Sequence, residues 1–380
     1  MELLSNAPAH ATVPDRYVFP PEKRAAMQLD HDPACKVAFP VIDLHGGRAL
    51  LSDNGQRRSQ VASDIVAAGK EFGFFQVVNH GVGDDAVQAF RAAAAAFFAL
   101  PAEEKQPYCS YDMSKRFRLA TSTSYDGGET RYWRDYVKFS CYPASDDNVR
   151  SWPSKPVEFA PRLVEYCEAV QELAQTLLGL VAEGLGLDSG FFAGEHSSGD
   201  TNMSINYYPP CPDPAVTMGL PAHCDRYLLT LLTQDDVAGL QARYGGRWLL
   251  ISPVPGAFVV NFGHQMEIIT NGLLASVEHR AVTNSSAVRM SVATHVRPTD
   301  GCLIKPAPEL VDEATHPAKY REFLFSEFLE AYDAADASRE DEGSVGEFQW
   351  MTCLKVAGLD GIFIACNHIF SDRLVSESAM

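Results

Sequence analysis

The chain has 380 residues and a formal net charge of −18, with 49 Asp or Glu against 31 Lys or Arg. This balance argues against nucleic acid and anionic membrane surfaces as partners, because both bind clustered basic side chains. No apolar run approaches the roughly 20 residues of a membrane helix, and residues 1–19 lack the basic and apolar regions of a secretory signal. The nine cysteines are scattered without a CxxC pair, which predicts reduced thiols in a cytoplasmic protein.

The first part of the chain is predicted to combine helices with a few short strands. Residues 1–36, rich in Pro, Ala and charge, are expected to form a flexible arm. Residues 37–160 are expected to form a first region, and its segment 110–128, rich in Ser, Thr, Gly and Asp, is expected to be a loop. The other predicted elements are strands at 37–44, 74–78 and 132–139, helices at 59–73 and 84–100, and a helical turn at 102–105.

A second region, residues 161–335, is predicted to be rich in β-strands. Apolar spacing predicts a long amphipathic helix over 161–187, and 310–332 is expected to be helical. Short apolar segments separated by turn signals predict strands at 204–208, 228–234, 240–243, 248–252, 257–261, 276–281 and 289–296. The expected fold class is therefore α+β: a double-stranded β-helix (a cupin-like jelly roll) that encloses a pocket, with N-terminal and supporting helices. Residues 336–380 are expected to be a mobile tail.

Two motifs in this region indicate a metal site. His223-Cys224-Asp225 and the later His279 provide two imidazoles and one carboxylate, the facial triad of non-haem Fe(II) oxygenases. Residues two apart on a strand point to the same face, so His223 and Asp225 can reach one ion. Arg289 and Ser291 repeat this spacing, and they offer a guanidinium and a hydroxyl to a cosubstrate that carries a carboxylate.

Together with other motifs, these make the chain resemble the plant-type 2-oxoglutarate- and Fe(II)-dependent dioxygenases, which include flavonoid and gibberellin oxidases. The resemblance covers about residues 37–335. The matching segments are FPVIDL (39–44), EFGFFQVVNHG (71–81), WRD (133–135), NYYPPCP (206–212), HCD (223–225), EHR (278–280) and RMS (289–291). PPCPDP (209–214) and SEF (326–328) are similar to the branch of hyoscyamine 6-hydroxylase and mugineic-acid hydroxylase.

The resemblance implies a set of residue roles and cofactors. Fe(II), 2-oxoglutarate and O2 are the expected cofactor and cosubstrates, with ascorbate as a candidate reductant that keeps the iron ferrous. The implied catalytic metal ligands are His223, Asp225 and His279, and the implied 2-oxoglutarate-binding residues are Asn206, Tyr208, Arg289 and Ser291. By matching with relatives, the substrate-binding residues are Tyr136, Lys138, Ser204, His295 and Arg297. The three of these that can carry positive charge would suit a carboxylate or phenolate.

The expected function is an oxidoreductase that hydroxylates or desaturates a small specialised metabolite or hormone and releases succinate and CO2. A monomer is expected, with no nucleic-acid or membrane partner. Departures from the family pattern are Cys224, Gly263-His264 in place of Gly-Asp, and the unmatched tail. Because of the unmatched tail, an alternative is a catalytically impaired jelly-roll binding protein. A hydrolytic zinc enzyme is disfavoured, because the usual zinc motifs are absent and the Arg289–Ser291 pair would have no role.

Overall fold

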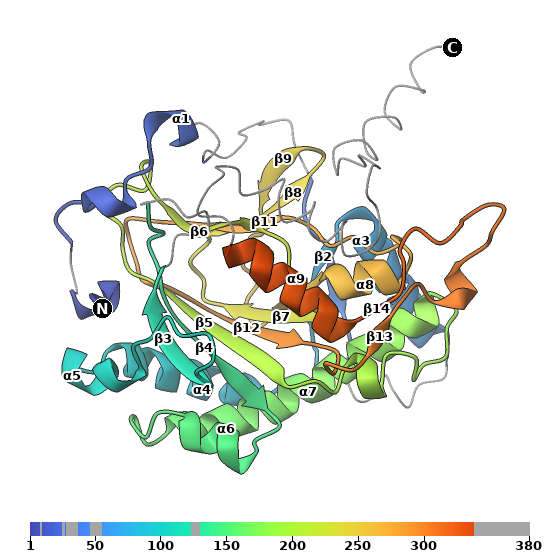
Figure 1. Ribbon diagram of the computed structural model, residues 1–380, viewed down its shortest axis with the longest axis horizontal. Coiled ribbons are helices and arrows are strands. Elements are labelled where there is room, and N and C mark those ends of the chain that lie inside the picture. The colour runs from blue at the N-terminus through green and yellow to red at the C-terminus, as the bar shows by residue number, and fades with distance from the viewer. Residues whose placement is uncertain (8–9, 25–26, 28–36, 46–54, 123–129, 338–380) are drawn as a thin grey trace.

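Two β-sheets enclose a cavity and helices support the larger sheet (Figure 1). The computed structural model describes residues 1–7, 10–24, 27, 37–45, 55–122 and 130–337. The larger sheet has eight strands, in the order β1 (Val41–Asp43), β2 (Phe74–Val78), β10 (Phe258–Phe262), β7 (Leu229–Gln234), β12 (Arg289–Val296), β5 (Thr201–Tyr208), β4 (Asp135–Tyr142) and β3 (Phe117–Thr121). All its pairs are antiparallel except β1 with β2.

The smaller sheet has four antiparallel strands, in the order β6 (Met218–His223), β11 (His279–Val282), β8 (Leu240–Tyr244) and β9 (Arg247–Leu250). A short pair, β13 (Leu303–Ile304) and β14 (Phe323–Leu324), lies outside both sheets. The predicted double-stranded β-helix with supporting helices is thus confirmed.

The described residues contain eight α-helices. They are α1 (Pro21–Arg24), α3 (Gln56–Glu71), α4 (Asp84–Phe98), α5 (Ala102–Lys105), α6 (Asp146–Ser151), α7 (Phe159–Gly184), α8 (His264–Ile269) and α9 (Phe325–Ala337). Helix α7 contacts β4 and β7, and α3 and α4 pack on α7. Single 3-10 turns occur at Leu4–Asn6, Asp15–Tyr17, Gln106–Tyr108, Gly194–His196 and Pro308–Leu310. Among the helices of the described residues, none has both the length and the apolar character needed to cross a bilayer.

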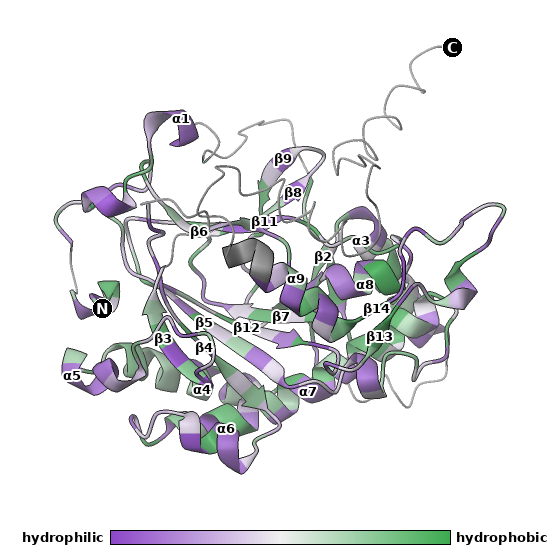
Figure 2. Cartoon of the chain, viewed as in Figure 1, coloured by the Kyte–Doolittle hydropathy of each residue, from purple (hydrophilic) through white to green (hydrophobic). Residues whose placement is uncertain are grey.

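Helix α7 is amphipathic in its first part and buried on most sides near its end. Up to Ala174 its buried residues, such as Leu163 and Val170, recur at three- and four-residue intervals and lie on one side. From Thr176 to Ala182 nearly every residue is buried. Figure 2 shows hydrophilic and hydrophobic stretches alternating along this helix. The long amphipathic helix predicted over 161–187 is confirmed, with both ends shifted by two or three residues.

The expected flexible arm is wrong for its described residues. Leu3, Leu4 and Tyr17 are buried, and the backbone N–H groups of Leu4 and Ser5 donate to the Asp135 carboxylate at 3.1 and 2.7 Å. Asp135 is itself fully buried at the start of β4, so these two donors satisfy charge that would otherwise be costly to bury. The N-terminal segment is therefore anchored through an acidic side chain that lies 130 positions further along the chain.

Two predicted segments differ from the structure, and strand β6 has no counterpart among the predicted elements. The segment 110–128 was expected to be a loop, but it contains β3, whose side chains are all buried because they pair with β4. Residues 310–332 are helical only from Phe325 onward. Strand β6 was missed because it contains Pro221, which is tolerated there since β6 is at an edge of its sheet. The short helices α6 and α8 also gave no clear sequence signal, and the expected mobile tail lies outside the described residues from 338 onward.

Gly263 marks the closest backbone approach near the cavity. A Cβ at this position would collide with the carbonyl of Tyr227 and lie 2.8 Å from the carbonyl of Asp225. The next residue, His264, donates its N–H to that Asp225 carbonyl at 2.8 Å. The segment after β6 can therefore pack against the start of α8 only if position 263 has no side chain.

We predict that Gly263→Ala lowers the free energy of unfolding by roughly 1–3 kcal/mol, because the added methyl forces two backbone segments apart. Chemical denaturation of both proteins measures the loss. Gly301→Ala is the matched control, because its Cβ would meet open space. Equal stability of the two variants would contradict this account of the packing.

Candidate active site

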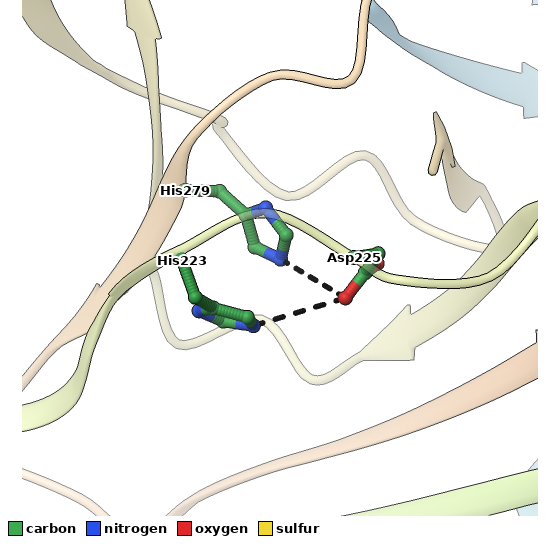
Figure 3. Close-up of side chains that lie close together, drawn as sticks. All are labelled: His223, Asp225 and His279. Atoms are coloured by element: carbon green, nitrogen blue, oxygen red, sulfur yellow. Dashed lines mark ion pairs between the residues drawn. The ribbon is translucent and has the colours of Figure 1, made fainter. Parts of the chain in front are cut away.

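The His–Asp–His cluster predicted from the sequence is assembled at one end of the smaller sheet (Figure 3). His223 is the last residue of β6 and pairs directly with His279, the first residue of β11. Each imidazole Nε2 lies 3.8 Å from Asp225 Oδ1. The expectation that His223 and Asp225 share a strand is wrong, because β6 ends at His223 and Asp225 lies in the segment beyond it.

Backbone carbonyls orient both imidazole rings. His223 Nδ1 lies 3.0 Å from the Pro221 carbonyl oxygen, and His279 Nδ1 lies 3.1 Å from that of Val277. A carbonyl oxygen can only accept, so each Nδ1 carries a proton, and in a neutral ring Nε2 is then the nitrogen that presents a lone pair. Hydrogen bonding of the distal ring nitrogen is the usual way in which proteins fix a metal-binding imidazole. The two lone pairs and Asp225 Oδ1 converge on one point, as a bound metal requires.

The second carboxylate oxygen of Asp225 is held by the larger sheet. Thr230 Oγ1 of β7 donates to Oδ2 at 2.6 Å, and Asn261 Nδ2 of β10 donates at 2.8 Å. Since the Thr230 hydroxyl proton is used here, His295 Nδ1, at 3.0 Å, must donate to the Thr230 oxygen. The result is a hydrogen-bonded chain from His295 through Thr230 to Asp225, which leaves Oδ1 facing the imidazoles.

The site favours the protonation states that bind metal. Burial opposes ionisation of Asp225, but the neighbouring imidazoles outweigh it and hold the pKa of this carboxyl well below its usual range. Burial, with the proximity of His279, lowers the pKa of His223 to about 3. Burial likewise lowers the pKa of His295 to about 4. At neutral pH the cluster therefore offers a carboxylate and a neutral His223 imidazole, the forms that coordinate metal ions.

The cluster opens into a cavity of about 490 Å³ between the two sheets, a size typical of small-molecule sites. Of the residues predicted to bind cosubstrate or substrate, eight line it: Asn206, Tyr208, Arg289, Ser291, Lys138, Ser204, His295 and Arg297. Tyr136 is not among the lining residues. Its ring lies 4.5 Å from the Arg134 guanidinium carbon and 5.6 Å from Lys138 Nζ, so it packs against two lining cations instead.

The expected cosubstrate residues occupy two neighbouring strands. Arg289 and Ser291 of β12 pair in register with Tyr208 and Asn206 of β5. The Arg289 guanidinium is buried, donates to Gln234 Oε1 at 2.9 Å and lies 5.2 Å from the centre of the Tyr208 ring. A guanidinium fixed in this way can bind a carboxylate through two parallel hydrogen bonds.

The three expected substrate cations are not equivalent. His295 is committed to the Thr230 hydroxyl, and burial lowers its pKa to about 4, so we expect it to be neutral at pH 7. Arg297 is paired with Asp300. Lys138 lines the cavity from β4.

Several residues of the site were not singled out from the sequence. Thr230 and Asn261 lie in ordinary apolar strands, and only the fold shows that they reach Asp225. Helix α9 contributes Leu329, Tyr332 and Asp333 to the cavity lining. Asp333 pairs with Arg226 at 2.7 Å, and this ion pair ties α9 to the residue next to Asp225. Figure 1 shows α9 lying across the space between the sheets.

Comparisons with known proteins agree with this geometry. Residues 199–298 match the 2OG-Fe(II) oxygenase superfamily, and residues 39–161 match the N-terminal family described as non-haem dioxygenase in morphine synthesis. The chain is 40% identical to 2'-deoxymugineic-acid 2'-dioxygenase of Hordeum vulgare, over 87% of this chain and 93% of that protein. It is 35% identical to hyoscyamine 6-dioxygenase of Hyoscyamus niger, over 87% and 94%. The crystal structure of JOX2 in complex with 2OG, Fe and JA superposes with a TM-score of 0.75 at 29% identity, covering 92% of this chain and 96% of that one.

We predict that Thr230→Val weakens Fe(II) binding roughly 10- to 100-fold, the usual effect of removing a hydrogen bond to a metal ligand. Anaerobic metal titration measures the change. Thr176→Val is the matched control, because Thr176 is also buried but donates to a backbone carbonyl within α7, remote from the site. If both variants bind iron as tightly as the parent protein, Thr230 does not hold Asp225 in place.

Proposed function

The chain belongs to the 2OG-Fe(II) oxygenase superfamily, and on that premise we propose that His223, Asp225 and His279 are the protein ligands of its iron. The chain is an oxidoreductase that depends on Fe(II), 2-oxoglutarate and O2. Two imidazoles and one carboxylate occupy one face of an iron coordination shell and leave positions open for other ligands. The observation that supports the assignment most strongly is the convergence of the three ligand atoms within 4.8 Å of one another.

Bound iron supplies the activation of O2, coupled to conversion of 2-oxoglutarate to succinate and CO2 and to oxidation of a substrate C–H bond. The protein's part is to bind and orient. We assign Arg289 and Ser291 to the distal carboxylate of 2-oxoglutarate, with Tyr208 as a third donor and Asn206 beside them. These side chains belong to paired positions of β12 and β5 that face the cavity, so one rigid pair of strands fixes the length and direction of the cosubstrate.

Exclusion of water is the second task of the site, because water at a reactive centre permits side reactions. Helix α9 lies across the cavity and is attached through the Arg226–Asp333 ion pair. Arg226 follows Asp225 directly, so closure by α9 and placement of the metal ligand are mechanically linked. No feature of the described residues favours the alternative of an impaired binding protein, because the metal cluster and the Arg289 pocket are both present.

The substrate that we propose is a small specialised metabolite or hormone, hydroxylated or desaturated at one carbon. Support comes from relatives named for 2'-deoxymugineic acid and hyoscyamine. We further propose a cytoplasmic monomer with two regions, 37–160 and 161–335, and a reductant such as ascorbate to keep the iron ferrous. Strands of both regions pair within the larger sheet, so the regions are expected to fold as one unit.

Succinate formation tests the reaction class. Fe(II)-loaded protein supplied with 2-oxoglutarate and O2 should form succinate, and a metabolite panel can be screened anaerobically through changes in the Fe(II)–2-oxoglutarate absorption band. Zn(II)-loaded protein is the control and should form none. Fe(II)-loaded protein that shows neither the band nor succinate would contradict the proposal.

Arg289→Met is expected to raise KM for 2-oxoglutarate at least about 30-fold, because hydrogen bonds to a charged partner contribute roughly 1.5–3 kcal/mol each. Initial rates of succinate release at varied 2-oxoglutarate give the value. Arg162→Met on the exposed side of α7 is the control, since its partners Glu158 and Glu165 lie outside the cavity. An unchanged KM in Arg289→Met would reject the assigned role.

A further inference from the structure

The cavity is strongly basic although the protein is acidic. Only two acidic side chains, Asp225 and Asp333, are found among the described residues that line it. The basic lining residues are Lys115, Arg116, Arg118, Arg134, Lys138, Arg226, Arg289 and Arg297. In a chain with 31 basic and 49 acidic residues, this excess of positive charge around one small cavity requires a local reason. Cavities lined by one sign of charge raise the local concentration of ligands of the opposite sign.

Several of these cations already have a role. Arg289 is assigned to the cosubstrate, and Arg226 and Arg297 form ion pairs with Asp333 and Asp300. Lys115 and Arg116 precede β3, and Arg116 is half-exposed and lies 3.9 Å from Asp147. Arg134 donates to Asn206 Oδ1 at 3.0 Å. Arg118 and Lys138 belong to β3 and β4, the last two strands at one end of the larger sheet.

Arg118 and Lys138 are direct cross-strand neighbours, in β3 and β4. Residues opposite each other in an antiparallel pair point to the same face, and both line the cavity. Lys138 also pairs with Ser204 of β5, another lining residue. Two cations and a hydroxyl therefore form a row across three adjacent strands.

This row is separate from the cosubstrate position. Ser291 of β12 pairs with Asn206 of β5, which pairs with Tyr136 of β4. Lys138 is on β4, two strands away from Ser291, and it is two residues along β4 from Tyr136, the residue in register with Ser291. With strands about 4.8 Å apart and about 3.4 Å per residue, the two Cα atoms are roughly 12 Å apart. A single 2-oxoglutarate bound at Arg289 and the metal would not occupy the row.

The guanidinium of Arg118 is largely withdrawn from solvent, with 8% of the residue exposed. Its Nη1 contacts the sulfur of Met113, which is a weak acceptor. Burying a charge is costly unless a charged or strongly polar partner compensates. An anionic ligand in the cavity would supply that compensation and would use the fork geometry of the guanidinium.

We propose that Arg118 and Lys138 form a binding site for a carboxylate of the substrate, so that the enzyme oxidises a small carboxylic acid. The inference rests on the proposed function, and it adds the substrate's chemical class and two specificity-determining residues. Ser204, next in the row, is placed to donate a third hydrogen bond. His295, which is hydrogen-bonded to Thr230, takes no part in binding the substrate carboxylate.

Binding of acids and of their methyl esters tests the proposal. The probes are 2'-deoxymugineic acid, salicylic acid and indole-3-acetic acid, each paired with its methyl ester, titrated calorimetrically into the anaerobic Fe(II)–2-oxoglutarate protein. At least one acid should bind roughly tenfold or more tightly than its ester, the value of one charged hydrogen-bonded contact. Arg118→Gln should abolish that preference, and Arg118→Lys should restore part of it.

Two controls separate the possible failures. Arg150→Gln, on the exposed face of α6, should keep the preference for the acid. The Fe(II)–2-oxoglutarate absorption band and the affinity for 2-oxoglutarate should be unchanged in Arg118→Gln. Absence of the band in the parent protein would reject the proposed function itself.

With the band intact, three results would overturn the carboxylate site alone. These are equal binding of acids and esters, failure of every acid to bind, and an Arg118→Gln variant that keeps the preference but binds 2-oxoglutarate more weakly. The last result would mean that Arg118 attracts 2-oxoglutarate and does not bind the carboxylate of the substrate. If Arg118→Gln does not fold, Lys138→Gln provides the same comparison, because it changes the neighbouring cation of the row.

Discussion

The pairing of β6 with β11 is the constraint on which the active site depends. In that antiparallel pair His223 lies directly opposite His279, and opposite residues in such a pair have Cα atoms only about 4.5–5.5 Å apart. The backbone ladder therefore places the two imidazoles side by side before any metal is present. Carbonyls of Pro221 and Val277 then fix the rotation of each ring. Little remains for the metal to organise, which favours tight and specific binding.

Asp225, the third proposed ligand, ties the two sheets together. Asp225 leaves the edge strand of the smaller sheet, but its second oxygen is held by Thr230 and Asn261, which belong to the larger sheet. Any separation of the sheets would pull Asp225 away from the imidazoles or break these hydrogen bonds. Because Gly263 has no side chain, the backbone at the start of α8 can also approach the backbone carbonyl of Asp225. Metal binding and closure of the jelly roll therefore stabilise each other.

Elements and residues that are marked by local spacing could be predicted from the sequence. Elements whose burial or anchoring depends on residues far away in the chain could not. Helix α7 and the strands around Arg289 follow from periodic apolar residues, and the metal ligands follow from residue type and spacing. Strand β3 was hidden because its burial comes from pairing with β4 rather than from its own composition. The anchoring of the N-terminal segment on Asp135 could not be predicted, since neither Leu4 nor Ser5 carries a side-chain signal for a contact made by backbone N–H groups.

For the same reason the net charge of the chain does not predict the charge of the cavity. A total of −18 gives the expectation that the protein has no polyanionic partner, but it averages over a surface that a small ligand never contacts. Three of the eight basic residues that line the cavity lie in the short segment 115–118 (KRFR), and the other five come from separate strands and loops. Only the sheet register brings Arg118 beside Lys138. The proposed charge selection is thus a property of the topology, and it could change through one or two strand residues while the overall charge and the His–Asp–His cluster are preserved.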